Sequence, residues 1–187
     1  MKKPIALLIM LIGTMILVFP TSVSADPAPG GPFTSSLRVQ NMGTESALIE
    51  VCFYDSDGNQ KDCLSDFDPI EPDDVLLILI PSDSHLGSGE YSAVVSSNQP
   101  LATLSDFSDE DSGAAYSGFN EGSTKWYIPG LHDNYFSYYS NIYAQNTSSS
   151  FTDIQLEIYA PNNPTPVYSD EKINVPPYAS VKWDLKG

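Results

Sequence analysis

Apolar and polar residues alternate along most of the chain, in short segments separated by Gly, Pro, Asn, Asp and Ser. No segment sustains apolar residues at the 3.6-residue spacing of an amphipathic helix. Short alternating segments with such boundaries are typical of an all-β sandwich or barrel. The strands that the pattern predicts are 36–40, 48–54, 60–67, 75–80, 91–96, 101–107, 125–128, 140–145, 152–159, 165–173 and 180–185.

The pattern repeats without a gap at an offset of 105 residues. The aligned segments are 36–41 with 141–146, 49–54 with 154–159, and 70–72 with 175–177. They share a Gln-Asn pair, a Tyr and a Pro in one register, which indicates an internal repeat.

The repeat also predicts which side chains face the core, because alternate residues of a strand share a face. Glu50 and Cys52 align with Gln155 and Glu157, so these positions are expected on the solvent-facing side. The positions that are apolar in both copies, and are expected to face the core, are Ile49, Val51 and Phe53 in the first copy and Ile154, Leu156 and Ile158 in the second.

The second copy is expected to be incomplete at its C-terminal end. The first copy continues past Ile80 into strands 91–96 and 101–107, whereas Leu185, the counterpart of Ile80, is followed only by Lys186 and Gly187. Missing strands leave unpaired backbone groups at a sheet edge. Two ways of covering the edge stay open: both copies pack into one closed pair of sandwiches, or a neighbouring chain adds a strand.

The N-terminus has the features of a secretory signal peptide, over residues 1–25. Lys2 and Lys3 precede an apolar run at 5–19, and a small-x-small pattern ends at Ala25. The run is shorter than the roughly 20 residues that span a bilayer as a helix. We therefore expect secretion, to the extracellular space or the cell surface, with no membrane insertion after cleavage.

The chain is strongly acidic, with 24 Asp and Glu against 8 Lys and Arg and a formal net charge of −16. Cleavage after Ala25 removes two of the basic residues and no acidic one, which lowers the net charge to −18. Such a surface repels nucleic acid and anionic lipid, so neither is an expected partner. Colloidal stability outside the cell explains the charge, although attraction of divalent cations or basic partners also fits it.

The two cysteines are predicted to form a disulfide across a hairpin. Asp57-Gly58 between two strand-like runs is a strong hairpin signal. With these residues as the turn, opposite positions have numbers that add up to 115, which pairs Tyr54 with Lys61 and Cys52 with Cys63. Opposite residues lie within disulfide range, and a pair of cysteines in a secreted chain is best explained by one bridge.

Motifs that carry chemistry are largely absent. The sequence holds no H-E-x-x-H and no G-x-S-x-G, and His85 and His132 lie on predicted loops. Residues 55–59 resemble the start of a calcium loop, but their Gly stands at position 4 instead of 6. We expect no enzymatic activity and no cofactor, with a weak Ca²⁺ candidate in the acidic cluster of Asp106, Asp109, Glu110 and Asp111.

An aromatic region precedes the second copy and offers a candidate ligand-binding surface. Aromatic side chains on a sheet stack on sugar rings and are favoured at protein contacts, although β propensity and core packing also explain them. Asn146-Thr147-Ser148 fits a glycosylation pattern, but its Asn aligns with Asn41 and is expected to serve the turn. The candidate residues are Trp126, Tyr127, Tyr135, Tyr138 and Tyr139.

Several segments together resemble the tandem extracellular Ig-like β-sandwich repeats of large bacterial surface proteins. They are Ser36–Gly43 (SLRVQNMG), Phe53-Tyr54, Asp57-Gly58, Ile70–Pro72, Gln99–Leu101, Tyr116–Phe119, Gly122 and Tyr127–Pro129. The resemblance covers most of 32–187 and implies spacer or surface modules, with nothing on activity. This chain differs in its length, its shortened second copy and its cysteine pair.

The expected organisation is a first β-sandwich repeat with an acidic linker over 26–124 and a second, incomplete repeat over 125–187. We expect a secreted, non-enzymatic surface or extracellular structural module, with self-assembly by strand complementation as one form. The expected partners are further copies or other surface proteins. The alternative is a carbohydrate- or protein-binding adhesive module that uses the aromatic region, with polysaccharide as the ligand.

Overall fold

The computed structural model describes residues 33–108, 113–132 and 140–185. This part of the chain is all-β, as predicted, with antiparallel sheets and one short helix, α1 (Ile80–Asp83). The strands are β1 (Thr34–Asn41), β2 (Ile49–Tyr54), β3 (Gln60–Leu64), β4 (Val75–Leu79), β5 (Ser92–Ser97), β6 (Leu101–Ser108), β7 (Gly113–Ser117), β8 (Asn141–Gln145), β9 (Thr152–Tyr159), β10 (Pro166–Val175) and β11 (Ser180–Asp184). The predicted signal peptide lies outside the described residues.

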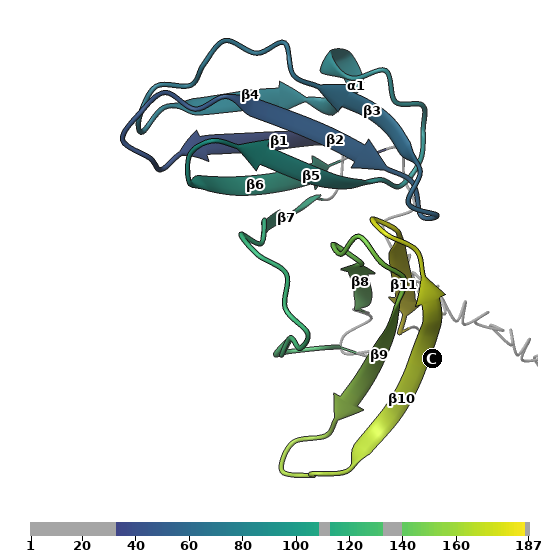
Figure 1. Ribbon diagram of the computed structural model, residues 1–187. Helices are drawn as coiled ribbons and strands as arrows, with labels where there is room; N and C mark the ends of the chain where they lie inside the picture. The colour runs from purple at the N-terminus through teal and green to yellow at the C-terminus, as the bar shows by residue number, and fades with distance from the viewer. Residues whose placement is uncertain (1–32, 109–112, 133–139, 186–187) are drawn as a thin grey trace, which may run out of the picture.

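Strands β1 to β7 form the first unit, in which two sheets stack face to face (Figure 1). One sheet has the order β4-β1-β6-β7 and the other β3-β2-β5. Alternate residues of β1 and β2 point between the sheets, as expected for sandwich strands. The buried core consists of Leu37, Val39, Ala47, Ile49, Val51, Phe53, Ile70 and Ile78.

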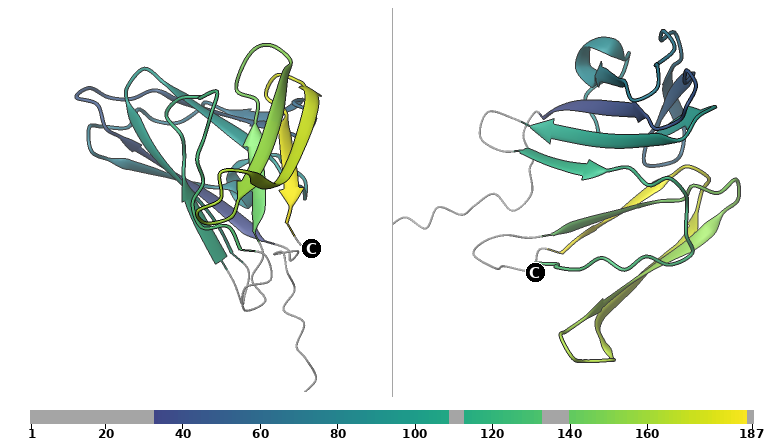
Figure 2. Two further views of the ribbon diagram at one scale, coloured as in Figure 1. Left: turned by 90° about the horizontal axis from the view of Figure 1, so that it is seen from below. Right: turned by 90° about the vertical axis from the view of Figure 1, so that its left-hand side faces the viewer.

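Strands β8 to β11 form the second unit, which lies as a separate body beside the first (Figure 2). It contains two antiparallel pairs, β8 with β11 and β9 with β10. The β8–β11 pair has the register of the β1–β4 pair at the offset of 105 residues, because Ser36 faces Leu79 and Asn141 faces Asp184.

The offset also reappears in the hydrogen bonds of two buried asparagines. Asn41 Nδ2 donates to the carbonyl oxygens of Glu45 (2.7 Å) and Ile70 (2.9 Å), and its Oδ1 accepts from Gly43 N–H (2.8 Å). At Asn146 the partners are each 105 residues further along. Its Nδ2 donates to Ser150 O and Val175 O, and its Oδ1 accepts from Ser148 N–H. These asparagines hold the strand-end turns, as the alignment predicted, and the buried Asn146 side chain is committed to the backbone.

The two copies differ in how completely they bury equivalent side chains. Ile49, Val51 and Phe53 are 5%, 0% and 4% exposed. Their counterparts in β9 point to the less exposed side of the strand, but all three are only half-buried, so the expectation of an equivalent core was wrong in this respect. The reason is that the second unit has no strands equivalent to β5 and β6 among the described residues. The half-buried side chains of β9 that correspond to Ile49, Val51 and Phe53 are Ile154, Leu156 and Ile158.

The disulfide between Cys52 and Cys63 is confirmed, with the two Cα atoms 4.1 Å apart and directly opposite in the register. Cys52 was expected on the wet face, but the bridge and strand β3 bury it. The turn differs from the prediction. Gly58 has φ 82°, and its N–H donates to Asp55 O, which closes a turn over residues 55–58. The residue opposite Tyr54 is therefore Gln60 instead of Lys61. An irregularity after Phe53 restores the predicted pairing at the cysteines.

Two further segments differ from the sequence prediction. Residues 125–128 form no strand, because they have no strand partner among the described residues and lead into Pro129. Residues 113–117, which were assigned to a linker, form β7 along the free edge of β6. The small side chains of Ala114 and Ala115 gave no apolar alternation, so only the available edge explains this strand.

The two units meet through a small set of side chains. The rings of Tyr54 and Tyr178 stack with centroids 4.9 Å apart, and Gln145 Nε2 donates to Ser92 Oγ at 2.9 Å. Gly58 lies against the backbone of the second unit, so that a Cβ there would be 2.3 Å from Pro177 O. The hairpin that carries the disulfide therefore also contacts the second unit.

Candidate functional site

The unusual feature of the molecule is a pair of strands that end their sheets on one side. In the first unit β1 lies between β4 and β6, and β2 lies between β3 and β5. The equivalent strands β8 and β9 each have one partner within the described residues, β11 and β10 respectively. One edge of β8 and one edge of β9 therefore present backbone N–H and C=O groups without a neighbouring strand. We call them the open edges.

Both open edges lie on the same side of the second unit (Figure 1). β8 and β9 run in opposite directions, and β11 and β10 lie beyond them on the other side. In the first unit the equivalent edges are covered by β5 and β6, which pair with β2 and β1 and are joined by a short turn at 98–100. Within the described residues, the second unit thus lacks the equivalents of β5 and β6, two consecutive strands that belong to different sheets.

Residues 118–132, which we call the strap, connect β7 to the second unit and pass this open side (Figure 2). The strap begins with a hydrogen bond from Gly118 N–H to Thr103 O and ends with one from His132 N–H to Ser140 Oγ. Among the described residues, no backbone hydrogen bond joins the strap to β8 or β9. The strap therefore provides no strand partner for the open edges in this part of the chain.

The strap lies near the end of β9 through Lys125. The pKa of the Lys125 ammonium group is raised, mainly by its contact with the Tyr127 hydroxyl and less strongly by Tyr159 and Glu157. The ammonium group also lies 5.1 Å from the centre of the Tyr127 ring. These are contacts between exposed side chains, so they contribute little to holding the strap.

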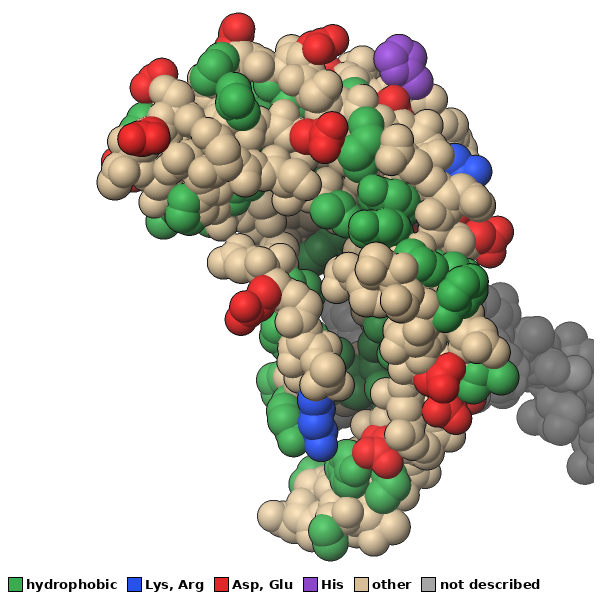
Figure 3. Space-filling view, viewed as in Figure 1, with side chains coloured by type: hydrophobic (Ala, Val, Ile, Leu, Met, Phe, Trp, Pro, Cys, Tyr) green, Lys and Arg blue, Asp and Glu red, His purple; other side chains and the backbone are tan. Residues whose placement is uncertain are grey.

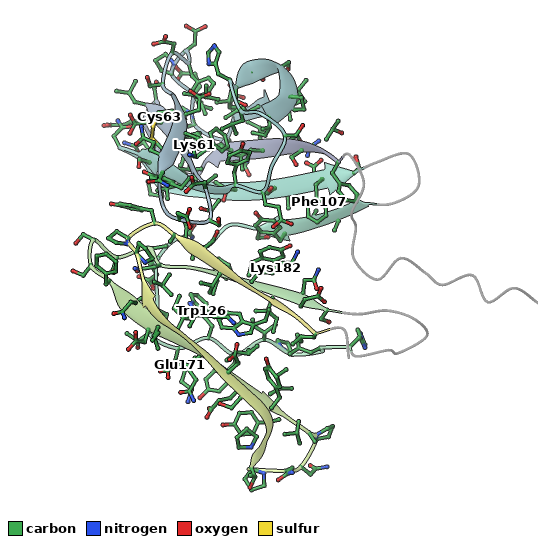
Figure 4. The ribbon with its side chains drawn as sticks, turned by 90° about the vertical axis from the view of Figure 1, so that its right-hand side faces the viewer. Lys61, Cys63, Phe107, Trp126, Glu171 and Lys182 are labelled. Carbon is green, nitrogen blue, oxygen red and sulfur yellow. A yellow bond between two sulfur atoms is a disulfide. The ribbon has the colours of Figure 1, made fainter. Side chains whose placement is uncertain are left out.

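The aromatic side chains of the strap are largely exposed. Phe119, Trp126 and Tyr127 are 74%, 53% and 82% exposed, and the rings of Phe119 and Trp126 lie 4.8 Å apart. In the view of Figure 4, the Trp126 side chain is seen between the strands of the second unit. The remaining predicted aromatic candidates, Tyr135, Tyr138 and Tyr139, lie outside the described residues.

The interior of the second unit is small and partly polar. Trp183 is 4% exposed, and its Nε1 donates to Asp170 Oδ2 at 2.8 Å, which links β11 to β10. Lys172 Nζ pairs with the same carboxylate oxygen at 2.7 Å and lies 5.7 Å from the centre of the Trp183 ring. These contacts lower the pKa of Asp170, mainly through the Lys172 hydrogen bond. Sequence reasoning missed this cluster, because nothing local pairs Asp170 with Trp183.

The structure describes one of the four residues of the weak calcium candidate, Asp106. Asp106 accepts a hydrogen bond from Ser36 Oγ at 2.6 Å and forms an ion pair with Arg38. These donors lower the pKa of the Asp106 carboxyl group, with Ser36 as the main cause. The other three acidic candidates (Asp109, Glu110 and Asp111) lie outside the described residues. Within the described ranges, no group of three or more His, Cys, Asp or Glu residues is placed to hold a metal ion.

The two histidines lie in separate surroundings. His85 is close to Asp62, with 3.5 Å between Nδ1 and Oδ2, and its backbone N–H is the main cause of the lowered pKa of that carboxyl group. The His132 backbone exchanges hydrogen bonds with Ser140 at the end of the strap.

Two open hollows accompany these features. One, of about 400 Å³, lies on the first unit between Leu48–Glu50 and Ser96–Asn98. The other, of about 510 Å³, lies between the Ser56-Asp57 turn and residues 171–181 of the second unit. The lining of the first includes Glu50, and the lining of the second includes Asp57, Glu171 and Lys172.

Charge is distributed unevenly between the two parts of the chain. Residues 33–124 contain 17 acidic and 2 basic residues, a net charge of −15, whereas residues 125–187 contain 6 acidic and 4 basic residues, a net charge of −2. Figure 3 shows acidic side chains spread over the first unit. The open edges therefore belong to the nearly neutral part of the molecule.

Comparisons with known proteins found no match to a protein-family model, a curated protein or a solved structure. The short helix α1 is the only helix in the described ranges, and no helix there has the length and apolar character to cross a membrane. The disulfide is compatible with an oxidising extracellular compartment.

Proposed function

We propose that the chain is a secreted, non-enzymatic structural module of two Ig-like repeats, in which the second, incomplete repeat self-associates through its open edges. In this proposal the chain resembles the tandem extracellular repeats of bacterial surface proteins, and strand complementation takes the place of strands equivalent to β5 and β6. The observation that carries the proposal is the contrast in strand partners within the described residues: β1 and β2 have two each, whereas β8 and β9 have one.

Two energetic arguments support self-association at this place. Unpaired strand edges are templates for further strands, since each added strand satisfies a row of backbone groups. The face of β9 that carries Ile154, Leu156 and Ile158 is also only half-buried, so a covering strand removes further apolar area from water, worth about 25 cal/mol per Å².

Hydrogen–deuterium exchange at several protein concentrations tests the proposal, together with sedimentation velocity. The amides of 141–145 and 152–159 on the open edges should exchange fast in dilute solution and become protected as the concentration rises. The amides of β1 and β2 are the internal control, because their protection should not depend on concentration. A chain that stays monomeric, with unchanged exchange in β8 and β9, would refute the proposal.

A second candidate function is polysaccharide binding by the strap. It is favoured by the exposure of Phe119, Trp126 and Tyr127, since exposed aromatic groups at this density mark contact surfaces. Affinity electrophoresis in gels that contain polysaccharide tests it, with Trp126→Ala as the variant and Phe151→Ala, at another exposed aromatic position, as the control. Equal retardation of both variants and the parent chain counts against the strap.

A further inference from the structure

We infer that two copies of the chain close one sandwich around a two-fold axis, with β9 of each copy paired antiparallel to β8 of the other. This inference rests on the proposed self-association and names its partner, geometry and register. Each sheet of the closed sandwich then has the order β10-β9-β8-β11, with two strands from each copy. Both open edges of both copies are covered at once, so the assembly stops at a dimer.

The strand directions permit this arrangement. β8 and β9 end the two sheets on the same side of the unit and run in opposite directions (Figure 1). A two-fold axis along the strands, between the two sheets, exchanges the sheets and keeps every strand direction. It therefore places β9 of the second copy beside β8 of the first in the antiparallel sense, and turns the inward face of each strand inward again.

The first unit supplies the register. Val39 of β1 is opposite Thr103 of β6, and Val51 of β2 is opposite Val95 of β5. Residues 95 and 103 are equally far from the turn at 98–100, so Val39 and Val51 lie at the same level along the strands. At the offset of 105, their counterparts Ala144 and Leu156 also share a level.

Since rotation about an axis along the strands does not change levels, Ala144 of one copy faces Leu156 of the other. Ile142, which is 6% exposed, then faces Ile158 of the second copy. The alternation also agrees, because Leu37 and Val39, the counterparts of Ile142 and Ala144, both point into the first-unit core. Apolar residues therefore meet apolar residues across both new strand pairs.

The charge distribution favours this occupant over other arrangements of two copies. A contact between second units joins parts with a net charge of −2 each, while the first units, at −15 each, remain on the outside. A contact that placed two first units together would meet much stronger repulsion.

The strap has to leave the open side when the strands pair. It is held there by exposed side chains, without backbone hydrogen bonds to β8 or β9 in the described ranges. The connection between Ser117 and Asn141 contains 23 residues, a length that reaches about 80 Å when extended. Neither unit needs to unfold for the strap to move aside.

Disulfide trapping between differently tagged chains tests the register. One chain carries Ala144→Cys and the other Leu156→Cys, because opposite residues in an antiparallel pair lie within disulfide range. The matched control replaces Leu156→Cys with Gln155→Cys, one residue away and on the opposite face of β9. Far-ultraviolet circular dichroism of each variant checks its fold, and sedimentation velocity of the parent chain gives the assembly size.

We expect a cross-linked heterodimer from the 144 and 156 pair, at least tenfold more abundant than from the 144 and 155 pair, and a parent chain that saturates at dimer mass. Association without the 144–156 cross-link overturns the two-fold pairing and leaves the proposed function intact. Growth beyond the dimer overturns the closed arrangement. A parent chain that stays monomeric, including one that binds only a strand from another protein, overturns both proposals.

Discussion

Replacing Asn41 with Ala tests whether one buried amide group holds the turn between β1 and β2. The side chain is fully buried and forms three hydrogen bonds with the backbone, to Glu45 O, Ile70 O and Gly43 N–H. Alanine removes all three hydrogen bonds, because its side chain has no donor or acceptor. The same substitution at Asn146 removes the equivalent bonds in the second unit.

The expected loss of unfolding free energy at Asn41 is about 2–3 kcal/mol. Each hydrogen bond contributes about 0.5–1.5 kcal/mol, so three contribute about 3 kcal/mol. The loss is reduced because Ile70 O keeps its bond from Ala47 N–H at 2.8 Å and because Glu45 is exposed, so that water reaches its carbonyl group. Gly43 N–H, which is half-buried, is the group that loses most.

Urea denaturation followed by far-ultraviolet circular dichroism measures the change, with the intrinsic fluorescence of Trp126 and Trp183 as a second signal. Asn98→Ala is the matched control, since its Oδ1 accepts a single exposed hydrogen bond, from Leu48 N–H at 2.7 Å. We expect the control to lose less than about 1 kcal/mol. If Asn41→Ala loses no more than Asn98→Ala, the reasoning about the buried turn is refuted.

Three further outcomes are expected. Replacing Cys52 and Cys63 together with Ser should lower the unfolding free energy by about 3 kcal/mol in urea titrations, because the unfolded chain gains freedom; an unchanged midpoint contradicts this. Gly58→Ala should cost about 1–2 kcal/mol from its positive φ and separate the units by its clash with Pro177 O, which small-angle scattering detects as a larger radius of gyration. The pKa of the Asp55 carboxyl group is lowered, chiefly by its hydrogen bond with the Lys61 ammonium group. Its contribution to stability is therefore present above the ordinary Asp pKa of 3.8 and is lost as the pH falls towards the lowered pKa. Thermal melts of Asp55→Asn should therefore show a smaller loss of stability on acidification than the parent chain, and equal losses count against the ion pair.

Local sequence signals predicted most strands and the disulfide because these depend on neighbouring residues. Alternation in 49–54 and 152–159 specifies strands whatever lies beside them, and a Gly at the turn brings Cys52 opposite Cys63 even though the turn type differs from the expected one. The role of the aligned asparagines in the turns was also predictable from the sequence, because the side chain of an Asn at a strand end readily forms hydrogen bonds with the backbone of the following turn.

Features that depend on distant partners were not predictable in the same way. β7 forms because β6 has a free edge, and the alternation of 113–117 contains no sign of it. Residues 125–128 have strand-like composition and no strand partner in the described ranges. The Asp170–Trp183 hydrogen bond links two strands across sheets, a contact that the sequence pattern does not encode.

The inward face of β9 carries large aliphatic side chains that are only half-buried. The sequence of β9 is as apolar at its inward positions as that of β2, yet Ile154, Leu156 and Ile158 remain accessible whereas Val51 is fully buried. A strand that only had to lie at a permanent surface would tolerate polar residues at those positions, since partial exposure of a large aliphatic side chain forgoes much of the roughly 1.5–3 kcal/mol available on burial. Polar residues do occupy the alternating positions Asp153, Gln155 and Glu157, so the apolar identity of the inward positions is specific to that face. The composition of β9 is therefore that of a strand with covering strands on its sheet, which is the physical reason to look for them on a second copy.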